Sequence, residues 1–228
     1  MKNNSREPIN VAQFGVGYWG PNLLRNLISN PRFNVRTVVD LSETRRDFVT
    51  SLYPGIPVDS TPEVVFENPN IDAVVIATPV ATHYDLAIRA VKSGKHVLVE
   101  KPMATRVEDV KNIGRVATEK NVTAMVGHTF LFNQAVRYVK GLIDDGELGD
   151  IRYIYSQRVN LGRIRNDVDA LWNLAPHDVS IIQYWLDDPN PGSISKIGMD
   201  YVQKGINDVV FLNVTYPNKV MAHIHVSW

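Results

Sequence analysis

The pattern of apolar and polar residues differs between the two halves of the chain. In the first half, short apolar runs rich in β-branched residues alternate with segments whose apolar residues recur every three to four positions. Such apolar runs suit strands buried on both faces, and the intervening segments suit amphipathic helices. This alternation predicts an α/β fold with a doubly wound parallel sheet. The predicted strands are 9–15, 35–40, 72–79, 96–102 and 123–128, and the predicted helices are 22–29, 83–95 and 106–121.

The second half follows a period of two after a further amphipathic helix at 134–149. Alternating apolar and polar residues indicate strands with one packed and one solvated face. We therefore predict two domains, 1–127 with the parallel sheet and an α+β domain, 128–228, with an open, mostly antiparallel sheet. The predicted elements of the second domain are strands at 151–160, 194–202, 208–216 and 219–228, a helix at 176–188 and a hairpin turn at "YPNK", 216–219.

The last predicted strand, 219–228, is followed by no helix or polar tail. An antiparallel sheet that ended there would expose an open apolar edge, which natural proteins usually cover. We therefore expect the second domain to be incomplete at its C-terminus, or its sheet to be covered by another chain.

Composition and charge mainly exclude classes of partner and of chemistry. The 24 basic residues balance 24 acidic ones, so nothing in the net charge favours nucleic acid or an anionic membrane as partner. The chain has no cysteine, which excludes disulfides, thiolate metal sites and a cysteine nucleophile. It shows neither a signal-peptide core nor an apolar run long enough to span a bilayer, so we predict a cytoplasmic protein.

Three glycines, Gly15, Gly17 and Gly20, form a G-x-G-x-x-G motif between the first predicted strand and helix. The first permits a tight turn, the second lets a pyrophosphate approach the backbone, and the third allows close helix–strand packing. Asp40 closes the next strand, twenty positions after Gly20. An acid at this offset binds both ribose hydroxyls of NAD and repels a 2′-phosphate, so the motif predicts an NAD site. The alternative is a glycine turn selected for packing alone.

Two arginines, Arg45 and Arg46, follow Asp40 and bear on the choice of cofactor. An arginine nearby can accommodate the 2′-phosphate of NADP. We interpret both as solvated helix charges, which favours NAD and leaves NADP open.

Four short motifs occur together in the first half: "ATP" at 77–79, His83, "GKHV" at 94–97 and "EKP" at 100–102. In combination they resemble the Gfo/Idh/MocA family of NAD(P)-dependent oxidoreductases. The stretch 159–182 resembles more narrowly the UDP-N-acetylglucosamine and UDP-N-acetylglucosaminuronate 3-dehydrogenases of that family. Family members extend beyond residue 228, which also implies a C-terminal truncation. The cofactor-binding residues implied by the resemblance are Gly15, Gly17, Tyr18, Trp19, Gly20, Asp40, Thr78, Pro79, His83, Glu100 and Lys101.

Lys101 lies at the C-terminal end of a predicted parallel strand, where doubly wound sheets bind their ligands. The resemblance implies that it is catalytic and that its bond to Pro102 is cis. Burial beside the positive nicotinamide would lower the pKa of Lys101, so that the amine could transfer a proton near neutral pH. The alternative is a strand-end lysine that points into solvent.

His177 matches the histidine of the family's D-x-G-x-H pattern, read here as Asn173-Leu-Ala-Pro-His177. Because Pro176 disfavours a continuous helix, we predict that a loop carries Asn173 and His177 and that the helix begins near His177. A neutral imidazole would accept the proton of a sugar hydroxyl. Asn173 replaces the family's acid and can orient a hydroxyl without acting as a base. The alternative is a helix-capping or core histidine.

The residues before His177 are rich in groups that bind phosphates and sugars. Arginine forks match phosphate or carboxylate oxygens, and an indole stacks on a base or sugar. A charged surface loop is the alternative. His223 and His225 alternate along one strand without an acid or cysteine partner, so no metal site is predicted. The predicted substrate-binding residues are Lys101, Arg158, Asn160, Arg163, Trp172, Asn173 and His177, with Lys101 and His177 catalytic.

Together these features predict an NAD-dependent oxidoreductase that transfers a hydride between nicotinamide and a ring carbon, C3, of a nucleotide sugar used in surface polysaccharides. The alternatives are an inositol or free-sugar dehydrogenase of the same family, and an NAD-binding fragment without turnover. The family resemblance and the one apolar face of the second sheet predict a homo-oligomer, a dimer or tetramer, formed through the second domain.

Overall fold

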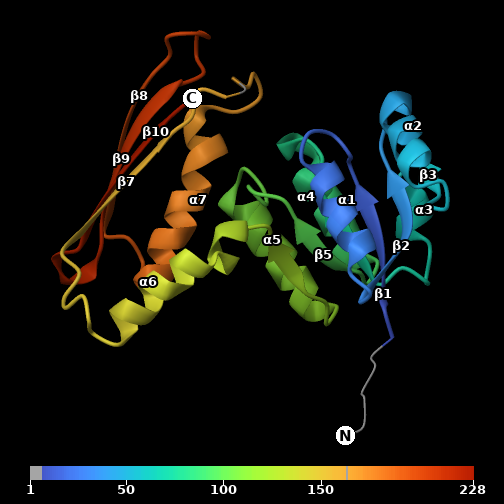
Figure 1. Ribbon diagram of the computed structural model, residues 1–228, viewed down its shortest axis with the longest axis horizontal. Helices are drawn as coiled ribbons and strands as arrows, with labels where there is room; N and C mark the ends of the chain where they lie inside the picture. The colour runs from blue at the N-terminus through green and yellow to red at the C-terminus, as the bar shows by residue number, and fades with distance from the viewer. Residues whose placement is uncertain (1–6, 163) are drawn as a thin grey trace, which may run out of the picture. The chain divides into compact units, whose positions relative to one another are not determined.

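A computed structural model describes residues 7–162 and 164–228 of the protein (Figure 1). The chain folds into two compact units, one ending at Gly127 and the other beginning at His128. Each unit has its own sheet and its own hydrophobic core.

The first unit is built on six parallel strands in the order β3-β2-β1-β4-β5-β6. The strand order reverses direction between β1 and β4, which defines the switch point where open α/β sheets bind ligands. The predicted parallel sheet is therefore confirmed. The strands are β1 (Ile9–Phe14), β2 (Phe33–Val39), β3 (Val58–Asp59), β4 (Ala73–Ile76), β5 (His96–Val99) and β6 (Ala124–Val126).

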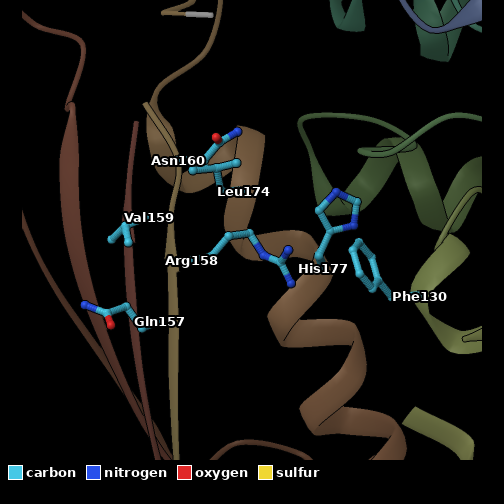
Figure 2. A pocket seen from close by; sticks show the side chains of 7 residues that line it. All are labelled: Phe130, Gln157, Arg158, Val159, Asn160, Leu174 and His177. Carbon is cyan, nitrogen blue, oxygen red and sulfur yellow. The ribbon is translucent and has the colours of Figure 1, made fainter. Parts of the chain in front are cut away.

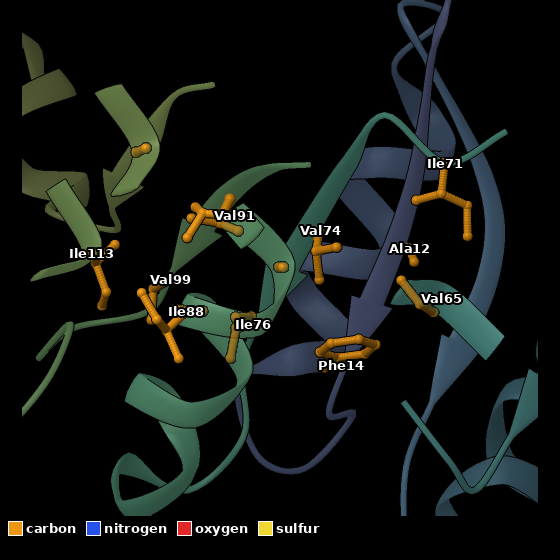
Figure 3. Close-up of a cluster of buried hydrophobic side chains, with 14 of the residues drawn as sticks. Ala12, Phe14, Val65, Ile71, Val74, Ile76, Ile88, Val91, Val99 and Ile113 are labelled. Atoms are coloured by element: carbon orange, nitrogen blue, oxygen red, sulfur yellow. The ribbon is translucent and has the colours of Figure 1, made fainter. Parts of the chain in front are cut away.

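Helices cover both faces of this sheet because each strand directs alternate apolar side chains to opposite sides. On one face, Phe14, Ile76 and Val99 pack against Ile88 of α4 and Ile113 of α5 (Figure 3). The opposite face packs against α1 and α2. The helices are α1 (Gly20–Ser29), α2 (Glu43–Leu52), α3 (Glu63–Phe66), α4 (His83–Lys92) and α5 (Val107–Glu119), with the 3₁₀ turn η1 (Val80–Thr82).

The second unit has a four-stranded sheet in the order β7-β10-β9-β8. Two of its three strand pairs are antiparallel, as predicted, while β7 and β10 run parallel. Asn218 and Lys219 adopt positive φ in the turn that joins β9 to β10, so the predicted hairpin is present. The strands are β7 (Tyr153–Val159), β8 (Ser193–Met199), β9 (Val209–Thr215) and β10 (Met221–Ser227); the other elements are η2 (Thr129–Phe132), α6 (Gln134–Asp144), α7 (Ala170–Trp185) and η3 (Pro217–Lys219).

Helix α7 begins earlier than the sequence predicts, and the predicted loop around Asn173 and His177 is wrong. The helix runs through Pro176, which occupies an interior position. Asp169 caps its start by accepting a hydrogen bond from the Trp172 backbone N–H at 2.9 Å. The cap and the apolar contacts of α7 with β9 and β10 offset the hydrogen bond that proline cannot donate.

The sheet of the second unit has one covered and one open face. Alternate residues of β9 and β10, including Leu212 and Ile224, pack under α7. The opposite face carries a row of stacked rings, in which Tyr155 lies 5.4 Å from His223 and Phe211 lies 4.4 Å from His225, centroid to centroid. Within the described residues, no helix is long and apolar enough to cross a membrane.

Candidate active site

The glycine motif forms a tight loop between β1 and α1. Gly15 has φ +86°, a conformation that side chains disfavour, and a Cβ there would lie 2.7 Å from the Ala77 carbonyl oxygen. A Cβ on Gly20 would lie 2.3 Å from the Gly15 carbonyl oxygen. A Cβ on Gly17, by contrast, would meet nothing within 4 Å. Packing therefore explains the first and third glycines, whereas the second leaves open space over the backbone.

Asp40 lies beside this loop, as the motif predicts. Its Oδ2 accepts a hydrogen bond from the Val16 backbone N–H at 2.8 Å, and its Oδ1 accepts one from the Ser42 backbone N–H at 2.9 Å. A carboxylate oxygen accepts more than one hydrogen bond, so acceptor capacity remains for two hydroxyls. Arg46 donates to the carbonyl oxygens of Asp40 and Leu41 at 2.8 and 2.9 Å. The interpretation of Arg46 as a merely solvated charge is therefore wrong, because its guanidinium is bound next to Asp40.

These residues fit a dinucleotide. The loop leads directly into the N-terminus of α1, where free backbone N–H groups and the helix dipole favour a pyrophosphate. The open space at Gly17 admits that group, and Asp40 supplies acceptors at the end of β2. Tyr18 and Trp19 of the same loop are 80% and 45% exposed, so both rings are accessible to a ligand.

Lys101 follows β5 and begins a cis peptide bond to Pro102, as the resemblance implies. Its backbone N–H donates to the Glu100 carboxylate at 3.3 Å. Burial raises the pKa of Glu100, against the opposing effects of hydrogen bonds with Lys101 and the Trp19 side chain and of the charge on Lys101. Glu100 thereby connects the glycine loop to the turn that carries Lys101.

His83 does not have the accessible position that its predicted role as a cofactor ligand requires. Its side chain is 1% exposed, so no surface remains for a cofactor to contact. Nδ1 lies 2.8 Å from the Pro102 carbonyl oxygen, and Nε2 lies 2.9 Å from that of Thr78. His83 instead joins the turn after β4 to the turn after β5. Thr78 and the exposed Pro79 form the first of these turns.

In the second unit, Arg158 of β7 forms an ion pair with Asp178 of α7. The Arg158 Nε lies 2.6 Å from Asp178 Oδ2, and Ser156 donates to Oδ1 at 2.5 Å. The Asp178 side chain is 8% exposed and that of Arg158 26%. Sequence reasoning gave Asp178 no role, and its partner Arg158 was predicted only as a substrate ligand.

Phe130 joins this ion pair to His177. The Arg158 guanidinium lies 4.7 Å above the Phe130 ring, and the His177 ring meets the same ring edge-on at 4.8 Å between centroids. Figure 2 shows Arg158 reaching from β7 toward His177 and Phe130. An open pocket of ≈ 520 Å³ is lined by Phe130, Gln157, Arg158, Val159, Asn160, Leu174 and His177.

Three of the residues predicted to bind substrate, Arg158, Asn160 and His177, therefore line one pocket. Trp172 and Asn173 do not line it, although Trp172 is 41% exposed and Asn173 lies one turn before His177 on α7. Arg163 lies outside the described residues. Arg165 is held by Asp167 through two hydrogen bonds of 2.7 and 2.5 Å, and this pairing raises its pKa.

Besides Asp178, sequence reasoning missed Phe130, which carries no recognisable signal in "HTFLF", and Gln13. Gln13 interrupts the apolar strand "VAQF", and a polar residue in a buried parallel strand is a readable signal. Among the described residues, no group of three His, Asp or Glu side chains could hold a metal ion.

Comparison with known proteins gives two matches that together cover most of the chain. Residues 9–128 match the description "Oxidoreductase family, NAD-binding Rossmann fold", and residues 136–228 match "GFO/IDH/MocA C-terminal domain".

Relatives with assigned names include two bacterial proteins. The 2,7-anhydro-N-acetylneuraminate hydratase of Mediterraneibacter gnavus is 31% identical, covering 91% of this chain and 58% of the relative. The NAD-dependent scyllo-inositol 2-dehydrogenase of Bacillus subtilis is 30% identical, covering 78% and 54%. The chain thus spans less than two thirds of the length of these relatives.

Solved structures agree with this assignment at the level of the fold. GenD2 from gentamicin A biosynthesis, solved with NAD, superimposes with a TM-score of 0.92 at 23% identity, covering 98% of this chain and 66% of that one. The scyllo-inositol dehydrogenase of Lactobacillus casei, solved with NAD(H) and scyllo-inositol, gives 0.85 at 21% identity, covering 97% and 70%. The glycine loop, the strand order and the two sequence matches agree, and the chain belongs to the Gfo/Idh/MocA family of oxidoreductases.

Proposed function

We propose that the protein is an NAD-dependent dehydrogenase that oxidises a secondary alcohol on a sugar or cyclitol ring. The observation that carries the proposal is the glycine loop, whose open face at Gly17 and neighbouring carboxylate of Asp40 fit a dinucleotide with a free 2′-hydroxyl. NADP stays the alternative, because Arg46 is bound beside Asp40. When bound, the nicotinamide supplies a hydride acceptor.

Oxidation of the alcohol also releases the hydroxyl proton, which side chains of the protein must accept. His177 is our candidate base, because a neutral imidazole accepts a proton from a hydroxyl near neutral pH. In the first unit, Lys101 is our candidate for transferring a proton beside the nicotinamide. Asn173 stands in place of the family's acid, so in this proposal it orients a hydroxyl and takes no proton.

The finer proposal concerns the substrate. A nucleotide sugar, oxidised at C3, is supported by the sequence pattern at 159–182 and by the exposed indole of Trp172, which could stack on a base.

A neutral cyclitol is the second candidate, and a specific observation favours it. Arg158 and Arg165 are both paired with carboxylates, so neither presents an uncompensated charge to a diphosphate. The pocket beside Arg158 and His177 is large enough for a small polyhydroxylated ring. The scyllo-inositol dehydrogenases among the relatives act on such a ring.

The decisive experiment measures NAD reduction with matched panels of UDP-sugars and inositols. We expect turnover with one class, and a Lys101→Met variant should lose 10²–10⁴-fold in kcat, on the order expected for a proton-transfer residue. The same variant should bind NAD within a few-fold of the wild type. No reduction with either panel, from a protein that binds NAD, would contradict the dehydrogenase assignment.

The experiment needs a second measurement, because one relative is named a hydratase and a hydratase adds or removes water without net oxidation. Product should therefore also be followed by mass spectrometry: a loss or gain of water without net NADH would replace the dehydrogenase with a redox-neutral reaction. A dimer or tetramer formed by the second unit is part of the proposal, and light scattering tests it.

A further inference from the structure

Gln13 is a buried polar residue in the middle of an apolar strand. It lies on β1, two positions before the first glycine of the loop, and its side chain is fully buried. Its Nε2 donates hydrogen bonds to the carbonyl oxygens of Gly15 at 3.0 Å and Gly20 at 2.9 Å. One amide group therefore connects the first and the third glycine of the motif.

These two hydrogen bonds hold the two ends of the glycine loop together on its buried side. The two ends of the loop already approach so closely that a Cβ on Gly20 would collide with the Gly15 carbonyl oxygen at 2.3 Å. The same Cβ would lie 3.2 Å from Gln13 Nε2, so the amide packs directly against the place where the two ends of the loop meet. Asp40 holds the loop from the other side through the Val16 N–H. The loop backbone is thus fixed by two side chains at three points.

The energetics indicate that folding alone does not explain Gln13. Its Oε1 is buried and has no hydrogen-bond partner among the described residues. An unsatisfied buried acceptor is destabilising and offsets much of what the two hydrogen bonds contribute. An apolar side chain of the same size would remove that orphaned acceptor, although the Gly15 and Gly20 carbonyl oxygens would lose this donor.

We propose that Gln13 is a positioning residue of the coenzyme site. It holds Gly15 and Gly20 at the separation in which the backbone N–H groups of the loop and of α1 face a pyrophosphate. This inference rests on the proposed NAD binding. Preorganisation lowers the cost of ordering the loop when the ligand binds, so its loss weakens affinity without removing any contact to the ligand.

The test is a Gln13→Met variant, which keeps the length of the side chain and removes its donor and acceptor. We expect its thermal midpoint to stay within a few degrees of the wild type, because the lost hydrogen bonds and the removed orphaned acceptor offset each other. Its Kd for NAD, measured by calorimetry on the whole chain, should rise about tenfold. A merely structural residue would lower the midpoint by many degrees and leave the Kd unchanged.

Gln183 offers a matched control. Its Nε2 also makes two hydrogen bonds, to Asp188 Oδ1 at 3.1 Å and the Pro189 carbonyl oxygen at 3.3 Å, and its Oε1 is likewise buried without a partner among the described residues. It belongs to α7, outside the unit that holds the glycine loop. A Gln183→Met variant should bind NAD as the wild type does.

The outcomes separate the inference from the proposed function. Unchanged affinity in Q13M, or a Q13M protein that fails to fold or melts many degrees below the wild type, overturns the role of Gln13. An equal loss of affinity in Q183M overturns it as well. A wild-type chain that binds no NAD refutes the proposed function itself, whatever the variants do.

Discussion

The glycine loop of the first unit and the Arg158 pocket of the second are built by different means. The loop is shaped by backbone: a positive φ at Gly15, a close approach at Gly20 and open space at Gly17. The pocket is shaped by side chains that come from separate elements, with Arg158 on β7, Asp178 on α7 and Phe130 on η2.

This difference determines what each site tolerates. The glycine loop fails when a Cβ is added at Gly15 or Gly20, because the neighbouring carbonyl cannot move aside. A site built from paired side chains can lose one member and keep its fold at a cost of a few kcal/mol, although the geometry of the remaining partners is no longer fixed.

The largest effect should come from Gly20→Ala, which places a methyl group 2.3 Å from the Gly15 carbonyl oxygen. Relieving that overlap requires a backbone shift, so we expect a loss of about 3 kcal/mol in the free energy of unfolding or an unfolded protein. Urea denaturation measures it. Gly114→Ala in α5 is the control, since a Cβ there meets nothing within 4 Å and alanine should gain about 0.5–1 kcal/mol.

The next largest effect tests the side-chain site. Asp178→Asn removes the charge that pairs with Arg158 and should lower the free energy of unfolding by about 2 kcal/mol, less than for a fully buried pair because Arg158 is a quarter exposed. The exposed Arg115–Glu119 pair is the reference, and Glu119→Gln should cost about 0.5 kcal/mol or less. Equal effects of the two variants would show that the Arg158 pair contributes no more than a surface pair.

A smaller effect of opposite sign is expected at Pro176. Alanine restores a backbone N–H within α7 and removes a poor helix former. The unfolded chain also gains freedom, so the net gain in stability should be about 1–2 kcal/mol. A destabilised Pro176→Ala would mean that neighbouring contacts depend on the proline ring, and differential scanning calorimetry would detect it.

The smallest effect concerns pH. Because burial raises the folded-state pKa of Glu100 above its unfolded value, the folded state binds this proton more tightly. The stability contributed by Glu100 is therefore fully present below the unfolded pKa and is lost as pH rises through the folded pKa. Glu100→Gln should flatten this dependence and leave the protein slightly more stable at neutral pH. Denaturation curves at pH 4 to 8 that parallel the wild type would contradict it.

The sequence predicts the strands of both sheets and the glycine loop, because buried parallel strands, alternating strands and the glycine motif are local patterns. The region around α2, β3 and α3 was not predicted, because β3 has two residues and α3 has four, too few for a periodic pattern.

The pocket of the second unit depends on contacts that no local pattern encodes. Arg158 and Asp178 are twenty positions apart, and nothing in either segment indicates that they pair. Pro176 was predicted to exclude a helix from the residues before it, yet capping by Asp169 and packing against β10 outweigh its local preference. The resemblance implies that His83 contacts the cofactor, whereas its side chain is buried and its ring nitrogens lie against the Pro102 and Thr78 carbonyl oxygens.

The parallel pairing of β7 with β10 has a consequence for the order of assembly. Among the described residues β7 pairs with β10 alone, and β10 follows it in the chain by about sixty residues. A ribosome therefore releases Arg158 long before the strand beside it exists, whereas β1 and β2 are joined by a single helix. During synthesis the glycine loop can fold early, and the pocket beside α7 is among the last parts of the described chain to form.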